Sequence, residues 1–151
     1  MTIEDVISRI NADKDVLGIT LYDGATYNDI KWFEQFQNLM LPNEVKIFYS
    51  FCNGFESEED MFRIIPLSEA AEHVNNLKAN QYYIAEYMIY CDAWILEFDQ
   101  ENPENYSIVS VRRNGEYLTL THSFIEFLTY FLNGGVFEEN GLYEWAAKKE
   151  G

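Results

Sequence analysis

The segment YSIVSVRRNGEYLTLTHSFIEFLTYFL, residues 106–132, decides the fold class of this chain. Alternating β-branched and aromatic residues predict strands over 106–112 and 116–121, and the Asn114-Gly115 pair between them is typical of a tight type I′ hairpin turn. Ser123 and Glu126 then form a capping box, followed by apolar residues at helical spacing. An antiparallel strand pair that leads into a helix predicts an α+β fold.

Upstream of this segment, the same reasoning predicts more strands and several helices. Runs of aromatic and β-branched residues separated by turn residues predict strands over 82–90 and 94–98, which would extend the antiparallel sheet as a meander. The other predicted strands are 16–21, which could also be a simple extended segment, and 61–65. Capping residues and apolar spacing predict helices over 3–12, from Asn28, from Pro42 to the Asn53-Gly54 stop, from Ser68, and within the tail 136–151.

The length and composition favour one folded domain over residues 1–151. A chain of 151 residues matches the commonest domain size, and 48% of its residues are hydrophobic. No Gly/Ser/Pro-rich linker or repeat divides it. The start lacks the features of a signal peptide, and no apolar run is long enough to span a bilayer, so we expect a cytoplasmic protein with no membrane contact.

The charge of the chain limits the partners that it can bind. The formal net charge is −16, from 26 Asp and Glu against 10 Lys and Arg. A negative field repels phosphate backbones, so we expect no nucleic-acid binding. The same field speeds the approach of basic proteins, although acidity that serves only solubility remains the alternative.

No motif points to catalysis, a metal or a cofactor. Cys52 and Cys91 each lie in an apolar segment without CxxC spacing, which predicts two buried free thiols and neither a disulfide nor a zinc site. Ser123 follows His122, but no GxSxG elbow surrounds it. We therefore expect a protein that is not an enzyme, although paired carboxylates of a hydrolase are too common by chance among 26 acids to be judged.

Three segments in a fixed order resemble the SUKH superfamily. They are Leu41-Pro42 before a helix that ends at Asn53-Gly54, Ile64-Ile65-Pro66-Leu67 with Glu69, and Ser123-Phe124 with Glu126-Phe127-Leu128. The resemblance spans about 3–132 and implies a twisted, mostly antiparallel sheet flanked by helices. The superfamily includes the fungal cell-wall-assembly regulators and many bacterial immunity proteins that are encoded beside toxins.

The resemblance and the acidity together favour a binding protein that neutralises a toxin. The hypothesis is that this chain covers the basic active cleft of a nuclease or a nucleic-acid deaminase by direct contact, without chemistry of its own. The alternatives are a regulatory scaffold like the fungal branch and, third, an undetected hydrolase. The identity of the partner and the oligomeric state stay open.

Two groups of residues are candidates for the partner-binding surface. The first is the acidic loop of Glu56, Glu58, Glu59 and Asp60, which is expected to steer a basic partner. The second is aromatic, because Tyr and Trp are favoured at interface hot spots, and consists of Tyr83, Tyr87 and Trp94. Since strand side chains alternate, Tyr83 and Tyr87 are expected on one face of the sheet and Tyr82 and Tyr90 on the other.

Overall fold

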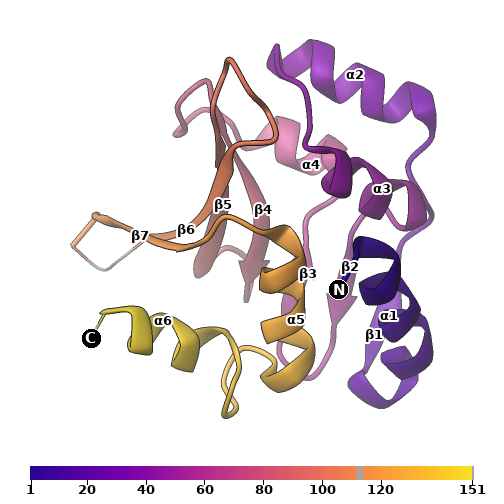
Figure 1. The fold of residues 1–151 in the computed structure, drawn as a ribbon, viewed down its shortest axis with the longest axis vertical. Coiled ribbons are helices and arrows are strands. Elements are labelled where there is room, and N and C mark those ends of the chain that lie inside the picture. Colours follow the sequence, from indigo (N-terminus) through magenta and orange to yellow (C-terminus); the bar gives the residue numbers. More distant parts are fainter. Residues whose placement is uncertain (112–113, 151) are drawn as a thin grey trace.

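The computed structural model describes residues 1–111 and 114–150. Within them, seven strands form one antiparallel sheet in which each strand pairs with the next along the chain (Figure 1). The predicted α+β class and the antiparallel sheet are confirmed. The strands are β1 (Ile19–Leu21), β2 (Phe55–Ser57), β3 (Phe62–Ile64), β4 (Gln81–Tyr87), β5 (Asp92–Phe98), β6 (Tyr106–Val111) and β7 (Tyr117–Thr121).

Six helices accompany the sheet in the same part of the chain. They are α1 (Ile3–Leu17), α2 (Tyr27–Gln37), α3 (Asn43–Phe51), α4 (Leu67–Glu72), α5 (Phe124–Gly134) and α6 (Leu142–Glu150). Thr2 and Thr26 each close a capping box, and Ser123 caps α5 by accepting a hydrogen bond from the Glu126 amide. Over the described residues, none of the helices has the length and apolar character that crossing a membrane requires.

Several predicted boundaries were wrong. α1 continues to Leu17, where Gly18 ends it in the left-handed conformation (φ 66°), so Val16 is helical and only Ile19–Leu21 forms a strand. Ser68 lies inside α4, whose N-cap is Pro66. Glu56, predicted in a loop, lies on β2.

The β6–β7 hairpin has the predicted pairing, but β7 begins one residue later than expected. Val111 pairs with Tyr117, so Glu116 lies outside the strand, and Gly115 has φ 84°. The Glu116 amide donates to Asn114 Oδ1 at 3.0 Å, so Asn114 still acts as a turn residue. Arg112, the predicted end of a strand, and Gly151, the end of the predicted tail, lie outside the described residues.

An aromatic cluster joins the helices to the sheet. Helices α1, α3 and α5 pack on one another, and α5 lies against the sheet (Figure 1). Phe62 of β3 is fully buried, stacked on Phe131 of α5 with centroids 4.2 Å apart and edge-on to Trp94 of β5 at 5.5 Å. At the edge of the molecule, α6 is fixed by Trp145, whose ring stacks on Tyr130 at 4.1 Å.

A β-bulge in β4 changes which side chains share a face. Tyr83 pairs with Ile95 and Ala85 pairs with Trp94, so Ile84 is an extra residue. Residues directly opposite each other in a sheet share a face, so Tyr83 lies on the face of Ile95, and Tyr87 lies on the face of its partner Asp92. Ile95 and Asp92 are three residues apart on β5, where side chains alternate, so their side chains lie on opposite faces. The expectation that Tyr83 and Tyr87 share a face is therefore wrong, because it assumed unbroken alternation.

Gly54 is required by a close contact between two segments rather than by a helix cap. α3 ends with Cys52 in an extended conformation, and Gly54 follows with φ 95°. A Cβ at this position would lie 2.3 Å from the backbone oxygen of Ile64, because β2 and β3 are adjacent. Only glycine fits at this point of the sheet.

Comparing Gly54→Ala with Gly115→Ala should separate this contact from the cost of positive φ. Gly115 also has positive φ, but a Cβ there would meet nothing within 4 Å. We expect Gly115→Ala to lower the free energy of unfolding by about 1–2 kcal/mol, and Gly54→Ala by more than about 3 kcal/mol because backbone atoms must also move. Urea denaturation of both variants measures this, and equal losses would contradict the assignment.

Candidate functional site

The turn between β4 and β5 has an unusual backbone. Three consecutive residues, Met88, Ile89 and Tyr90, have positive φ values of 50°, 52° and 61°. Glycine and asparagine are the usual residues in the left-handed region, and each other L-residue there costs about 1–2 kcal/mol. An isoleucine is a marked exception because its Cβ is branched. Such a turn persists only if its surroundings hold it.

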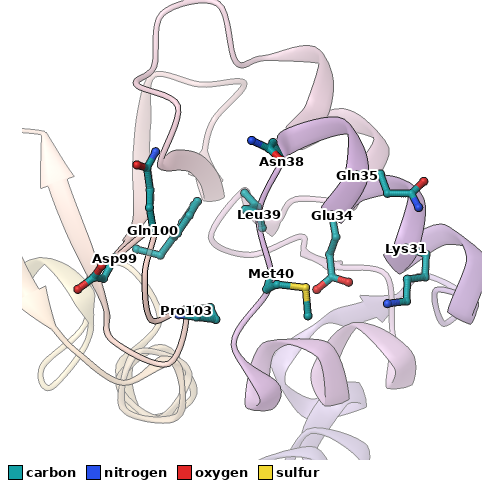
Figure 2. Close-up of a pocket in the computed structure, with 10 residues that line it drawn as sticks. Lys31, Glu34, Gln35, Asn38, Leu39, Met40, Asp99, Gln100 and Pro103 are labelled. Carbon is teal, nitrogen blue, oxygen red and sulfur yellow. The ribbon is translucent and has the colours of Figure 1, made fainter.

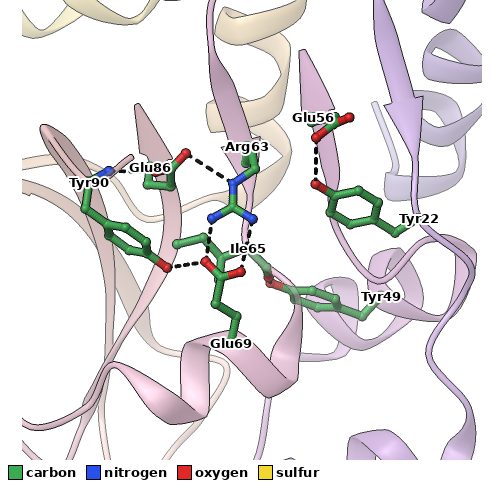
Figure 3. Close-up of polar contacts among 8 residues, drawn as sticks. All are labelled: Tyr22, Tyr49, Glu56, Arg63, Ile65, Glu69, Glu86 and Tyr90. Carbon is green, nitrogen blue, oxygen red and sulfur yellow. Dashed lines mark hydrogen bonds and ion pairs between the residues drawn. The ribbon is translucent and has the colours of Figure 1, made fainter. Parts of the chain in front are cut away.

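A buried carboxylate holds this turn. Glu86 is 2% exposed, and its Oε2 accepts a hydrogen bond from the Tyr90 amide at 2.7 Å while its Oε1 accepts one from Arg63 Nε at 3.2 Å (Figure 3). The Met88 amide donates to the Met61 carbonyl at 2.9 Å, which ties the turn to the neighbouring β2–β3 hairpin. Both partners of Glu86 are donors, so its charge is compensated inside the protein.

Glu69 of α4 completes the network. It forms a two-pronged ion pair with the Arg63 guanidinium and accepts a hydrogen bond from the Tyr90 hydroxyl (Figure 3). The hydrogen bonds that Arg63 donates to Glu69 lower the pKa of the Glu69 carboxyl and raise the pKa of the Arg63 guanidinium. His73 stacks on the Tyr90 ring at 4.5 Å. Two carboxylates therefore take up the positive charge of Arg63, and the turn is fixed through both the backbone and the side chain of Tyr90.

A concave surface of about 300 Å³ lies where the β2–β3 and β4–β5 turns meet. Three exposed apolar side chains contribute to it: Met61 (51% exposed), Met88 (38%) and Ile89 (87%). Its acidic members are Glu56, Glu58 and Glu86. We call this surface the apolar–acidic cup, defined by Glu56, Ser57, Glu58, Met61, Phe62, Arg63, Glu86, Met88 and Ile89.

The four predicted acids do not all lie on the same surface. Glu56 and Glu58 line the cup, and the Glu56 carboxylate accepts a hydrogen bond from the Tyr22 hydroxyl at 3.1 Å (Figure 3). Glu59 is exposed near Gly18 at the end of α1. Asp60 turns toward the loop after α5, where burial raises its pKa although the Val136 amide donates to it. Only part of the acidic segment therefore surrounds the apolar residues.

Two of the three predicted aromatic residues reach a common surface in the structure, and the third does not. Tyr83 and Tyr87 both line a second concavity, of about 490 Å³, together with Tyr90, Cys91, Asp92, Ala93, Val111 and Tyr143. Trp94 is 1% exposed and packs between Phe62 and Phe127, so its side chain belongs to the core and does not reach the surface. The β4–β5 turn separates this aromatic concavity from the cup, since Met88 and Ile89 line one and Tyr90 and Cys91 the other.

The two cysteines differ in exposure. Cys52 is fully buried, and burial raises the pKa of its thiol to about 12. Cys91 is free and exposed beside the β4–β5 turn, so the expectation of two buried thiols was half wrong. Cys91 lies in the turn between β4 and β5, which the surrounding apolar sequence did not indicate.

Another cleft lies at the end of β5 that is farther from the cup. It has a volume of about 500 Å³ between the end of α2 and the loop after β5, with Lys31, Glu34, Gln35, Asn38, Leu39, Met40, Phe98, Asp99, Gln100 and Pro103 around it (Figure 2). Its buried carboxylate, Glu34, accepts a hydrogen bond from the Leu41 amide at 2.8 Å and so holds the chain reversal after α2. This accounts for the burial of Glu34 in structural terms.

The arrangement around the β4–β5 turn suits protein binding. Its exposed groups are thioether, branched aliphatic and carboxylate side chains on a braced backbone, which is the composition of an interface anchor with a charged rim. Within residues 1–111 and 114–150, His, Cys, Asp and Glu do not gather into groups of three or more that suit a metal ion. Arg63 and Glu86 were missed in the sequence analysis. The signal that could have found them is a charged residue within an apolar run, 61–65, and another within an aromatic run, 82–90.

A comparison with known protein families gives a match. A family model described as SMI1 / KNR4 family (SUKH-1) matches residues 24–130, which is more than half of the chain. The match includes both turns of the cup, Glu69 and most of α5, and it is narrower than the expected span of 3–132 because it leaves out α1 and β1. No curated protein matches the chain.

Arg63→Met should test whether Arg63 supports the turn. Removing the guanidinium leaves the buried Glu86 carboxylate without one of its two donors, so we expect a loss of about 3 kcal/mol in the free energy of unfolding. Arg9→Met is the matched control, because Arg9 pairs with Asp13 on the surface of α1 and should change stability by less than about 0.5 kcal/mol. Urea denaturation measures both, and a similar small effect of the two changes would contradict the assigned role.

The Glu69–Arg63 pair should also make stability depend on pH. The pKa of Glu69 is lowered from its ordinary 4.5 in the folded protein, so its carboxylate stabilises the fold above that pH and loses the effect as pH falls through the folded pKa. The difference in unfolding free energy between wild type and Glu69→Gln should therefore be constant from about pH 7 to 5 and shrink at lower pH. Exposed Glu72→Gln is the control, and a Glu69→Gln difference that persists unchanged down to about pH 3 would refute the pairing.

Proposed function

The chain belongs to the SMI1 / KNR4 family (SUKH-1), and on this basis we propose that it is a non-enzymatic immunity protein, which neutralises a basic toxin enzyme by binding it directly. The favoured targets are a nuclease or a nucleic-acid deaminase, since enzymes that act on nucleic acids carry basic clefts. The binding surface is the β4–β5 turn with the apolar–acidic cup. The observation that carries the proposal is the cup itself, where exposed Met and Ile side chains lie among carboxylates.

The charges of the cup support a basic partner. The basic residue in the cup, Arg63, is already paired with Glu69 and Glu86, so it presents little free positive charge to a partner. The chain as a whole has a formal net charge of −16. An acidic surface of this kind attracts a basic cleft over a distance of about one Debye length, roughly 8 Å at physiological ionic strength.

Neutralisation by this surface requires only that it covers the target's cleft. Apolar side chains in the centre of an interface supply most of the affinity, while the charged rim sets the rate of association and the selectivity. The cup has both parts within one concave surface. Because Glu86 and Glu69 hold the turn in place before binding, little ordering cost is expected on association.

A second candidate function is a regulatory scaffold that holds more than one partner, and one observation favours it. On α2, the exposed rings of Trp32 and Phe36 stack at 5.2 Å, 48% and 54% exposed. The cleft of Figure 2 lies between the end of α2 and the loop after β5, whereas the cup lies at the other end of β4 and β5. Two apolar surfaces at opposite ends suit two partners.

The direct test is inhibition of the enzyme encoded by the gene adjacent to that of this chain. Purified full-length protein should bind that enzyme and abolish its nuclease or deaminase activity at equimolar concentration. Full activity of the enzyme in the presence of excess protein would exclude the toxin-neutralising function. Two different proteins bound at the same time, neither of them inhibited, would favour the scaffold.

Neutralising the exposed acids of the β2–β3 turn should slow association. Glu58→Gln/Glu59→Gln is the variant of choice, since Glu56 and Asp60 make hydrogen bonds within the fold. We expect association to slow several-fold at low salt and much less at high salt, with little change in dissociation, because exposed charges steer rather than anchor.

The matched control removes two charges elsewhere. Glu72→Gln/Glu101→Gln changes exposed acids on α4 and in the loop after β5, and should alter the association rate less than the first variant. Stopped-flow measurements with the inhibited enzyme separate the two rates. Equal slowing by both variants would show that the net charge of the protein, not this turn, speeds association. No slowing by either variant would show that these charges do not affect association.

A further inference from the structure

Ile89 combines two properties that a residue serving only the fold would not have. Its side chain is 87% exposed, so it buries almost no apolar surface, and its backbone has φ 52°. Asparagine or glycine would adopt this backbone more easily, and asparagine would also suit the exposure. Both properties of Ile89 therefore disfavour the free protein, which points to a use in a complex.

The turn presents Ile89 in a fixed position. The preceding residue, Met88, is hydrogen-bonded through its amide to Met61, and the following residue, Tyr90, is held through its amide by Glu86 and through its hydroxyl by Glu69. The Cys91 amide also donates to the Met88 carbonyl at 3.2 Å, which closes the turn. A side chain held on both flanks loses little freedom on binding, which is the property of an anchor residue.

The surroundings of Ile89 define the chemistry of its receptor. Met61 and Met88 extend the apolar surface beside it, and Glu56 and Glu58 lie in the same cup. Methionine side chains adapt to irregular apolar walls. A complementary surface therefore has an apolar pocket that accepts a branched aliphatic side chain, with Lys or Arg at its mouth to pair with the two carboxylates.

We propose that Ile89 is the central anchor of the interface and inserts into an apolar pocket on a basic protein, with Met61 and Met88 against the pocket's mouth. This inference deepens the proposed function and rests on it. The inference adds the residue that determines the affinity, and it explains the left-handed turn as the structure that holds this residue exposed. The Trp32–Phe36 pair on α2 is the competing surface for the same partner.

The first experiment locates the contact. A photo-crosslinking amino acid replaces Ile89 or, as control, Tyr27, which is 73% exposed on α2, in the full chain expressed in its native cells. We expect position 89 to crosslink to one basic protein, within a peptide that contains aliphatic residues and Lys or Arg, and position 27 not to do so. Crosslinking from position 27 alone, or to an acidic segment, or none from position 89, would overturn the inference.

The second experiment measures affinity for the purified protein so identified. Ile89→Asn should weaken binding at least about 30-fold, the effect of losing a hot-spot residue, whereas Tyr27→Asn should change it less than about two-fold. The melting temperature of free Ile89→Asn should stay equal or rise by a few degrees, because asparagine tolerates positive φ. Unchanged affinity of Ile89→Asn, or a fall of several degrees in its melting temperature, would contradict the anchor role.

The outcomes distinguish the anchor from the function. If the protein crosslinked at position 89 is a basic protein whose activity is not inhibited, the anchor stands and the toxin-neutralising function fails. If an enzyme is inhibited but Ile89→Asn inhibits it equally well, the function stands and the anchor fails. The exposed Cys91 gives an independent readout, because alkylation of its thiol should slow when a partner covers the turn while buried Cys52 stays unreactive.

Discussion

The buried carboxylate of Glu86 is the constraint on which the binding surface depends. A carboxylate with 2% exposure requires donors at both oxygens, and it finds them in two different places, the Arg63 side chain on β3 and the Tyr90 amide after β4. Satisfying the charge therefore fixes the geometry between a strand and a turn. Replacing Glu86 by an apolar residue would remove the desolvation cost but also the bond that holds the left-handed backbone.

This dependence explains why stability and binding conflict in the same few residues. The three left-handed residues of the β4–β5 turn, a buried ion pair and exposed aliphatic side chains each cost stability, and the high negative charge adds repulsion across the surface. The aromatic core around Phe62 and Trp94 offsets these costs on the other side of the sheet. One face of the sheet thus stabilises the fold, and the β4–β5 turn is suited to contact with a partner protein.

Much of the architecture could be predicted from the sequence, because local signals agreed with the fold. Asn114-Gly115 correctly marked the last hairpin, and Ser123 correctly marked the start of α5. The site was harder to predict. Met88-Ile89-Tyr90 contains no glycine, asparagine or proline, so propensity placed it in a strand, and the contacts with Glu86, Glu69 and Met61 hold it as a turn. The extra residue at Ile84 is likewise set by packing, which reversed the expected face of Tyr87 relative to Tyr83.

The sequential order of the strands has a consequence for how the sheet forms and opens. β4 and β5 meet across a turn of residues 88–91, whereas β1 reaches β2 only after α2 and α3 have been placed between Leu21 and Phe55. Since closing a longer loop costs more chain entropy, the central hairpin can assemble early and the β1 edge late. Backbone amides of β4 and β5 should therefore exchange with solvent more slowly than those of β1. A partner would then bind a β4–β5 turn that keeps its conformation while the β1 edge of the sheet opens and closes.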